Sequence, residues 1–375
     1  MFNRLNLSTV KIIAVVGLII LGLISTLAIA NYIKTANIIK NQSINSQFVF
    51  NQSSQKILNN QWIINSAQAR ELVAQGATIL DARSCKILNP QSLLNATCIS
   101  WQEFSQSESP FKGKLLTDDK ILTEKLQAIG IFNHKPIIVF SNTINGWGED
   151  GRIVWMLRTL GHQKSFLVDG GFAALVKGGF PTVNFTKNNS PPRGDFVVNR
   201  NKNWHISQNE LKTSLEKDNL VIIDSRGPQE YAGKTPYGEQ RGGHIPGAIH
   251  IYFKYWLDNN GMLLSRDKIL EMLTEKGITK DKIIVTYCTG GVRSAWSTSV
   301  LTDLGFKVKN YSGSMWEWSA SSSDIYPLEI SRKEGVGVLE DTERGRHGDA
   351  ERGCHRVTAS PYLRFLMGSR GVREK

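Results

Sequence analysis

The chain has 375 residues, more than the size at which a single hydrophobic core keeps growing, so two domains are expected. Its formal net charge of +12 is carried largely by the two ends of the chain. Residues 1–60 hold five Lys/Arg and no Asp/Glu, whereas residues 61–330, which we call the body, hold 30 basic and 26 acidic residues. A body so nearly balanced in charge, without a Lys/Arg stripe among aromatic residues, argues against nucleic acid as a partner.

The first predicted element is a membrane anchor over residues 1–34. Residues 12–30 carry no charge, and at about 1.5 Å per residue a helix of this length spans a bilayer core of about 30 Å. The sequence Ala28-Ile29-Ala30 resembles a signal-peptide cleavage site, but the run is longer than the apolar region of about 7 to 15 residues in a signal peptide. We therefore favour an uncleaved anchor with the body outside the cytoplasm, whereas cleavage after Ala30 would give a secreted or periplasmic protein.

Two flanking segments lack the periodicity of a helix or a strand. Residues 35–61 are rich in Asn, Gln and Ser, which suits a spacer between a membrane and the body. Residues 327–375 favour Arg over Lys, unlike the body, and are interspersed with Gly, so we predict a disordered tail.

Between these flanks the sequence contains an internal repeat. Three landmarks recur in the same order, at offsets of 143, 146 and 144 residues: ILDAR at 79–83 with IIDSR at 222–226, IIVF at 137–140 with IIVT at 283–286, and Leu160-Gly161 with Leu304-Gly305. Such a period indicates two copies of one fold. Each copy alternates short β-branched runs with amphipathic stretches, which is typical of a parallel sheet covered by helices. We predict domains at 62–184 and 203–326, joined by a linker at 185–202.

The candidate chemistry lies in KIIVTYCTGGVRSAWSTSVL at 282–301. A β-branched strand ends at Tyr287, Cys288 follows at once, two glycines permit a tight loop, and a helical pattern begins near Val292. Backbone N–H groups of such a loop can form an anion cradle, and the helix N-terminus adds about half a positive charge. Both effects favour the thiolate, which is the nucleophilic form of cysteine. Arg293 is permanently charged and can hold an anionic donor or steady the charge of the cysteine. The competing interpretation is a structural cysteine buried at a strand end.

The other cysteines, Cys85, Cys98 and Cys354, give no further site. The chain has no C-x-x-C pair and no Cys/His spacing that would build a zinc site, so we expect no metal. Cys85 and Cys98 could form a disulfide in an oxidising compartment, but we favour buried or unreacted thiols.

Four ordered segments of the second copy resemble the signatures of the rhodanese family: DSRGPQEYAG at 224–233, GGHIPGAIHI at 242–251, YCTGGVRS at 287–294 and NYSGSMWEW at 310–318. In the first copy, LVDGGFAALVKGGFP at 167–181 matches the counterpart of the last of these motifs, and this copy resembles the family's non-catalytic domain. The resemblance implies an α/β fold of two tandem rhodanese-like domains, each a parallel β-sheet flanked by helices. The apolar run adds an N-terminal transmembrane helix to this architecture.

The resemblance also implies roles for particular residues. Cys288 becomes the sulfur carrier. The active-site loop that binds the substrate comprises Thr289, Gly290, Gly291, Val292 and Arg293. Four residues of the first signature support the loops through hydrogen bonds and an ion pair: Asp224, Arg226, Glu230 and His244. The IIVF/IIVT match places Asn142 at the position of Cys288, so we interpret the first copy as a catalytically silent partner that shapes one wall of the cleft.

The implied function is a sulfurtransferase that needs no cofactor. It would move a sulfane sulfur from a small anionic donor, through a persulfide on Cys288, to cyanide, a thiol or a protein acceptor. Thr289 and Gly290 match neither the Cys-Arg-Lys-Gly loop of thiosulfate-specific members nor the Cys-Gly-Ser-Gly loop of mercaptopyruvate-specific members. We prefer thiosulfate over 3-mercaptopyruvate because Arg293 offers a fixed cation for a dianion.

Two alternatives stay open. The first is a non-catalytic binding or scaffold module, against which the presence of Cys288, both glycines and Arg293 argues. The second is a Cys-dependent phosphatase on a related fold. The phosphatase loop is C-x5-R, one residue longer than the C-x4-R from Cys288 to Arg293, and no Asp beside the loop offers the general acid that a phosphatase needs.

Overall fold

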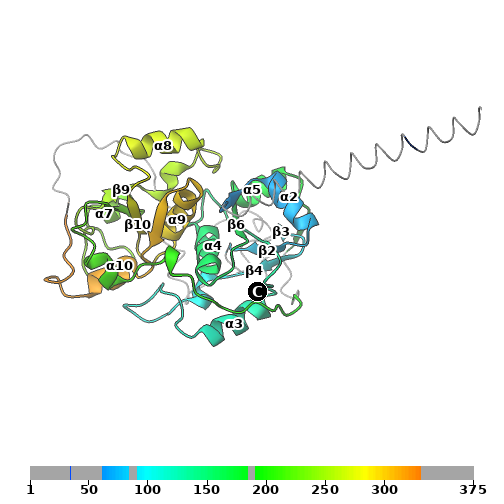
Figure 1. The fold of residues 1–375 in the computed structure, drawn as a ribbon, viewed down its shortest axis with the longest axis horizontal. Helices are drawn as coiled ribbons and strands as arrows, with labels where there is room; N and C mark the ends of the chain where they lie inside the picture. The colour runs from blue at the N-terminus through cyan, green and yellow to red at the C-terminus, as the bar shows by residue number, and fades with distance from the viewer. Residues whose placement is uncertain (1–33, 35–60, 84–90, 185–190, 331–375) are drawn as a thin grey trace, which may run out of the picture. The chain divides into compact units, whose positions relative to one another are not determined.

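The computed structural model describes Lys34 and residues 61–83, 91–184 and 191–330 (Figure 1). Within these residues no helix has the length and apolar character needed to cross a membrane. The predicted anchor at 12–30 and the tail from 331 lie outside the described residues, so both stay predictions.

The first sheet contains five strands, and all its neighbouring strands are parallel. In spatial order they are β1 (Ile63–Ile64), β6 (Ser165–Val168), β5 (Ile137–Phe140), β2 (Thr78–Asp81) and β4 (Ala96–Cys98). The first half also contains a short antiparallel pair, β3 (Gln91–Leu93) and β7 (Thr182–Asn184). The helical segments of this half are α2 (Ser66–Ala74), η1 (Trp101–Phe104), α3 (Asp119–Ala128), α4 (Glu149–Thr159) and α5 (Gly171–Lys177).

The second sheet is also parallel and repeats the strand order of the first. Its strands are β11 (Lys307–Asn310), β10 (Ile283–Tyr287), β8 (Leu220–Asp224) and β9 (Ile249–His250), which match β6, β5, β2 and β4. A parallel bridge from His205 to Asn310 takes the place of β1. The helical segments of this half are η2 (Lys202–Trp204), α6 (Gln208–Lys212), α7 (Pro228–Tyr231), η3 (Phe253–Trp256), α8 (Arg266–Thr274), α9 (Arg293–Asp303) and α10 (Ser314–Ala320).

Parallel strands are buried on both faces, and this explains the continuous apolar runs of the two central strands. All four residues of β5 are buried, as are four of the five residues of β10. The predicted α/β class, with parallel sheets flanked by helices, is therefore confirmed. The described part of the predicted linker is not a free spacer, because Phe196 packs into the core and is 2 % exposed.

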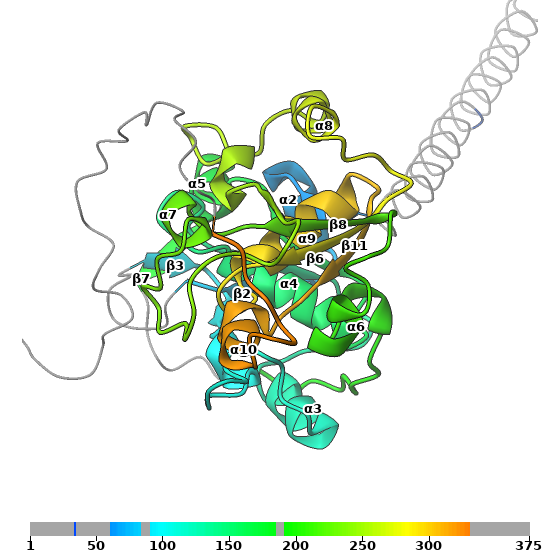
Figure 2. The same cartoon turned by 90° about the vertical axis from the view of Figure 1, so that its left-hand side faces the viewer.

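The two halves join through α4 and α9, which lie side by side between the sheets (Figures 1 and 2). A Cβ at Gly151 of α4 would lie 2.5 Å from the Cα of Trp296 on α9, so only glycine permits this approach. Side chains of both helices belong to one hydrophobic core that spans the two halves. All described residues accordingly fall into one compact unit, and the division into domains at 62–184 and 203–326 stays a prediction.

Candidate active site

Cys288 follows β10 directly, at the carboxyl end of a central parallel strand, where ligands bind in such sheets. Its side chain is 1 % exposed. The sulfur accepts the N–H of Gly291 at 3.1 Å and lies 3.6 Å from the hydroxyl of Ser294. Among the described residues Cys288 is the free cysteine.

The loop from Thr289 to Val292 is held from outside by α10. The N–H groups of Met315 and Trp316 donate to the carbonyls of Cys288 and Thr289, at 3.1 and 3.0 Å. These bonds turn the carbonyls outward and leave N–H groups of the loop to face the sulfur. Glycine is required at Gly290 because a Cβ there would lie 2.1 Å from the ring of Trp316.

The second glycine and the helix start complete the loop. Gly291 has a φ of +78°, which L side chains rarely adopt. Val292 is the N-cap of α9, so the predicted helix start near this residue is confirmed. The dipole of this eleven-residue helix points its positive end at the loop.

The electrostatic surroundings of Cys288 favour its thiolate. Burial by itself would raise the pKa of the thiol. The charge of Arg293, the hydrogen bonds from Ser294 and the N–H of Gly290 outweigh burial and lower the pKa below its usual value. The thiol therefore has the environment of a reactive cysteine rather than that of an inert core residue.

Arg293 is fully engaged by a carboxylate. Its Nη1 and Nη2 donate to the two oxygens of Glu230 at 2.6 and 2.8 Å, and Nη2 also donates to the hydroxyl of Thr289 at 2.7 Å. The two side chains are 5 % and 8 % exposed, and the guanidinium lies over the rings of Trp147 and Tyr237. Of the two roles expected for Arg293, this pairing favours steadying the negative charge of Cys288, whose pKa Arg293 lowers, over holding the donor.

The supporting residues separate into two groups. Arg226 donates to both carboxylate oxygens of Asp224 and to the carbonyl of Gly243, and Asp224 also accepts the hydroxyl of Tyr287 at 2.6 Å. This buried network ties the end of β8 to β10, just before Cys288. His244 lies apart from it, since its ring stacks on Tyr231 at 3.8 Å and its Nδ1 contacts the carbonyl of that residue.

Three site residues escaped the sequence analysis. Glu239 is buried and lies 3.2 Å from the hydroxyl of Thr289. Ser294 stands within the quoted loop motif and contacts the sulfur, so its position one residue after Arg293 was the available signal. Arg152 comes from the first half, where its Nη1 donates to the carbonyl of Gly291 at 3.1 Å, and no motif of the second copy points to it.

The structure corrects the counterpart of Cys288 in the first half. The sheet register pairs Phe140 with Asp81 and Tyr287 with Asp224, so the residue that follows Phe140 matches Cys288. That residue is Ser141, not Asn142. The offset between equivalent residues of β5 and β10 is one residue longer than the offset of the IIVF/IIVT match. Its carbonyl accepts the N–H of Phe172 just as that of Cys288 accepts the N–H of Met315.

The remaining cysteine and cavity lie away from the loop. Cys98 at the end of β4 is disulfide-bonded, so the favoured interpretation of a free thiol is wrong for this residue; Cys85 lies outside the described residues.

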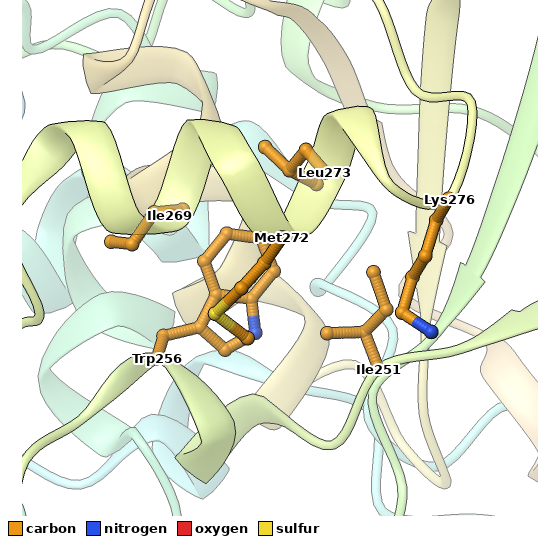
Figure 3. Close-up of a pocket in the computed structure, with 6 residues that line it drawn as sticks. All are labelled: Ile251, Trp256, Ile269, Met272, Leu273 and Lys276. Carbon is orange, nitrogen blue, oxygen red and sulfur yellow. The ribbon is translucent and has the colours of Figure 1, made fainter.

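A small apolar cavity between η3 and α8 is lined by Ile251, Trp256, Ile269, Met272, Leu273 and Lys276 (Figure 3). In the described part of the chain, no group of three or more His, Cys, Asp or Glu is arranged to hold a metal ion.

Comparisons with known proteins agree with this geometry. The model of the rhodanese-like domain family matches residues 207–321. The thiosulfate sulfurtransferase of Azotobacter vinelandii is 32% identical over 200 residues, which are 52% of this chain and 72% of that protein. The thiosulfate sulfurtransferase of Bos taurus is 24% identical over 275 residues, which are 70% of this chain and 91% of that protein.

The fold has relatives among solved structures as well. The 3-mercaptopyruvate sulfurtransferase from Leishmania major superposes with a TM-score of 0.58 at 19% identity, over 70% of this chain and 75% of that one. This likeness shows a shared fold, and the family follows from the family model and the curated relatives. The chain belongs to the rhodanese family of sulfurtransferases.

Proposed function

We propose that Cys288 carries a sulfane sulfur as a persulfide between a small anionic donor and a thiophilic acceptor. The observation that carries this proposal is the buried sulfur at the end of β10, which accepts the N–H of Gly291 at 3.1 Å and has a lowered pKa. A lowered pKa makes the thiolate available near neutral pH, and the N–H donor can hold a negative charge on sulfur in either half of the cycle.

The reaction has two steps. The thiolate of Cys288 attacks the outer sulfur of the donor, the S–S bond of thiosulfate breaks, and sulfite leaves with its electron pair. The terminal sulfur of the resulting persulfide anion is then attacked by the acceptor, and the thiolate is restored. With cyanide as acceptor the product is thiocyanate. This is covalent catalysis, for which ping-pong kinetics are expected.

Thiosulfate is the proposed donor, with 3-mercaptopyruvate as the second choice. Support comes from the curated relatives of Azotobacter vinelandii and Bos taurus, which are named thiosulfate sulfurtransferases. Because Glu230 already binds Arg293, the donor anion would rest on the N–H groups of the loop and the N-terminus of α9. A thiol or a protein remains a possible acceptor besides cyanide. The pairing of Arg293 with Glu230 gives no support to the phosphatase alternative.

The first half is proposed to be a second rhodanese-like domain without catalysis. The matching strand orders of the two sheets support the repeat. Helices α4 and α9 both have eleven residues and end before the matched Leu-Gly landmarks, so Glu149 stands where Arg293 stands. Burial raises the pKa of Glu149 to about 7, and the site holds an acidic group where the active half holds a cation. Such a site offers no positive charge to an anionic donor.

The central test is the intact mass of the purified protein after incubation with thiosulfate. We expect a gain of one sulfur atom on the peptide that contains Cys288, and loss of that sulfur with release of thiocyanate when cyanide is added. An aryl phosphate serves as the control substrate. Steady hydrolysis of the phosphate with no sulfur on Cys288 would replace the proposal by the phosphatase alternative.

Attachment to a membrane through residues 12–30, with the body outside the cytoplasm, is also proposed, on the basis of the apolar run. The full chain should then sediment with membranes and resist extraction by high salt. N-terminal sequencing of the mature protein gives the decisive measurement, since a chain that starts at Asn31 would show a cleaved signal peptide instead.

A further inference from the structure

Arg152 joins the two halves at the catalytic loop. It lies on α4, is 0 % exposed, and donates through Nη1 to the carbonyl of Gly291 at 3.1 Å. Its Nη2 donates to the hydroxyl of Ser105 at 3.0 Å and to the carbonyl of Gly113, both in the first half. One guanidinium therefore connects a segment of the first half to the loop that carries Cys288.

The loop has little freedom at this junction. The carbonyl of Gly291 accepts from Arg152 and, at 3.3 Å, from the side-chain amide of Asn310. The N–H of the same Gly291 donates to the sulfur of Cys288. A Cβ at Gly113 would lie 2.4 Å from the carbonyl oxygen of Gly290, so the first-half segment abuts the loop directly. The bonds to the carbonyl of Gly291 thus restrain the same residue whose N–H faces the sulfur.

The charge of Arg152 is not compensated as that of Arg293 is. Glu230 neutralises Arg293, whereas no carboxylate in the described ranges forms an ion pair with Arg152, and its Nε has no hydrogen-bond partner there. Burial lowers the pKa of Arg152 to about 9, while the charge of Cys288 acts to raise it. Arg152 thus stays cationic near neutral pH. Because such coupling is reciprocal, its charge favours the thiolate of Cys288 in turn, in addition to the charge of Arg293, which acts on the pKa of Cys288 most strongly after burial.

We propose that Arg152 is a positioning residue for sulfur transfer, which fixes Gly291 against the sulfur and supplies the uncompensated positive charge that stabilises the anion on Cys288. This assignment rests on the proposed function for its role in turnover. It also gives the catalytically silent first half a second role besides shaping the cleft. The second half cannot form the complete environment of the Cys288 thiolate by itself, because Arg152 comes from the first half.

The test compares Arg152→Met, Arg152→Lys and Arg158→Met by the pH dependence of Cys288 alkylation with iodoacetamide, followed at the Cys288 peptide. Arg158 is the matched control because it lies on the same helix, is 2 % exposed, and has a pKa that burial likewise lowers to about 9. Its side chain bonds to the carbonyls of Ser165 and Gln61, away from the loop.

For Arg152→Met we expect the midpoint of alkylation to rise by about one to two pH units, since loss of a nearby opposite charge acts on this scale. Turnover over Michaelis constant for thiosulfate near neutral pH should fall by about tenfold or more. Arg152→Lys should shift the midpoint less, because the ammonium keeps the charge but loses the planar fork. Arg158→Met should lower the melting temperature and leave the midpoint at its wild-type value.

The other charged groups that face Cys288, namely Arg293, Glu230 and Glu239, are unchanged in all three variants. A wild-type midpoint in Arg152→Met would overturn the inference and reduce Arg152 to a packing residue. Should that variant fail to fold, a wild-type midpoint in Arg152→Lys has the same meaning. Alkylation does not require sulfur transfer. A shifted midpoint in a protein that forms no persulfide would therefore refute the proposed function, while the role of Arg152 in stabilising the anion on Cys288 would stand.

Discussion

Replacement of Cys288 by Ser is expected to abolish sulfur transfer, with a loss of about four orders of magnitude or more in turnover. The hydroxyl is a far weaker nucleophile than the thiolate and cannot form the persulfide. The fold should persist, because the sulfur is held by the N–H of Gly291 and the hydroxyl of Ser294, and an oxygen can accept the same donors. The assay is thiocyanate formation from thiosulfate and cyanide, together with circular dichroism of the variant.

Cys98→Ser is the control for this experiment. Cys98 ends β4 in the first sheet and is disulfide-bonded, so its loss should lower the melting temperature while the folded protein keeps its turnover. If Cys288→Ser turned over at a wild-type rate, Cys288 would not be the sulfur carrier. Loss of all activity in folded Cys98→Ser would show that turnover also requires Cys98.

The strands and the nucleophile could be predicted because their signals are local. The runs around Ile137 and Ile283 are continuous and rich in β-branched residues, which is typical of strands buried on both faces, and Cys288 stands directly after one of them. The two glycines and Val292 then required a tight loop and a helix start. Both occur where the pattern predicted them.

Contacts between distant segments could not be predicted in the same way. The sequence indicated that Arg293 was charged, but Glu230 lies 63 residues before it, and only the folded chain shows that the two charges neutralise each other. The role of Arg152 could not be predicted from the sequence for a different reason. Ten of the eleven residues of α4 are buried, so the helix has no polar face against which an inward-pointing arginine would stand out.

The counterpart of Cys288 shows a limit of matching short motifs. The IIVF/IIVT match was correct for the strands but shifted by one residue from the register that the hydrogen bonds impose, and it selected Asn142 in place of Ser141. Because side chains alternate along a strand, a shift of one residue changes the face to which each is assigned. Only the pairing with Asp81 and Asp224 determines the register.

The second large effect is expected for Glu230→Gln, which removes one charge of the buried pair without changing its shape. Arg293 would remain 5 % exposed with no carboxylate partner, and breaking such a pair costs about 3–5 kcal/mol of unfolding free energy. Urea denaturation of the two proteins at neutral pH measures this difference. The matched control is Glu239→Gln, since Glu239 is similarly buried near the same loop but accepts hydrogen bonds without an ion pair, and should cost about 1–3 kcal/mol.

The same variant should also change how stability depends on pH. Burial would raise the pKa of Glu230, but the charge of Arg293 outweighs burial and lowers the pKa below its ordinary value of 4.5. The folded state therefore binds fewer protons than the unfolded state in this range, so the contribution of Glu230 is complete above pH 4.5 and is lost as the pH falls through the folded pKa. Glu230→Gln should flatten this acid limb of the stability curve, whereas Glu239→Gln should retain the part that Glu230 supplies. If both variants lost equal stability and kept the wild-type acid limb, the pair of Glu230 and Arg293 would not be what holds the loop around Cys288.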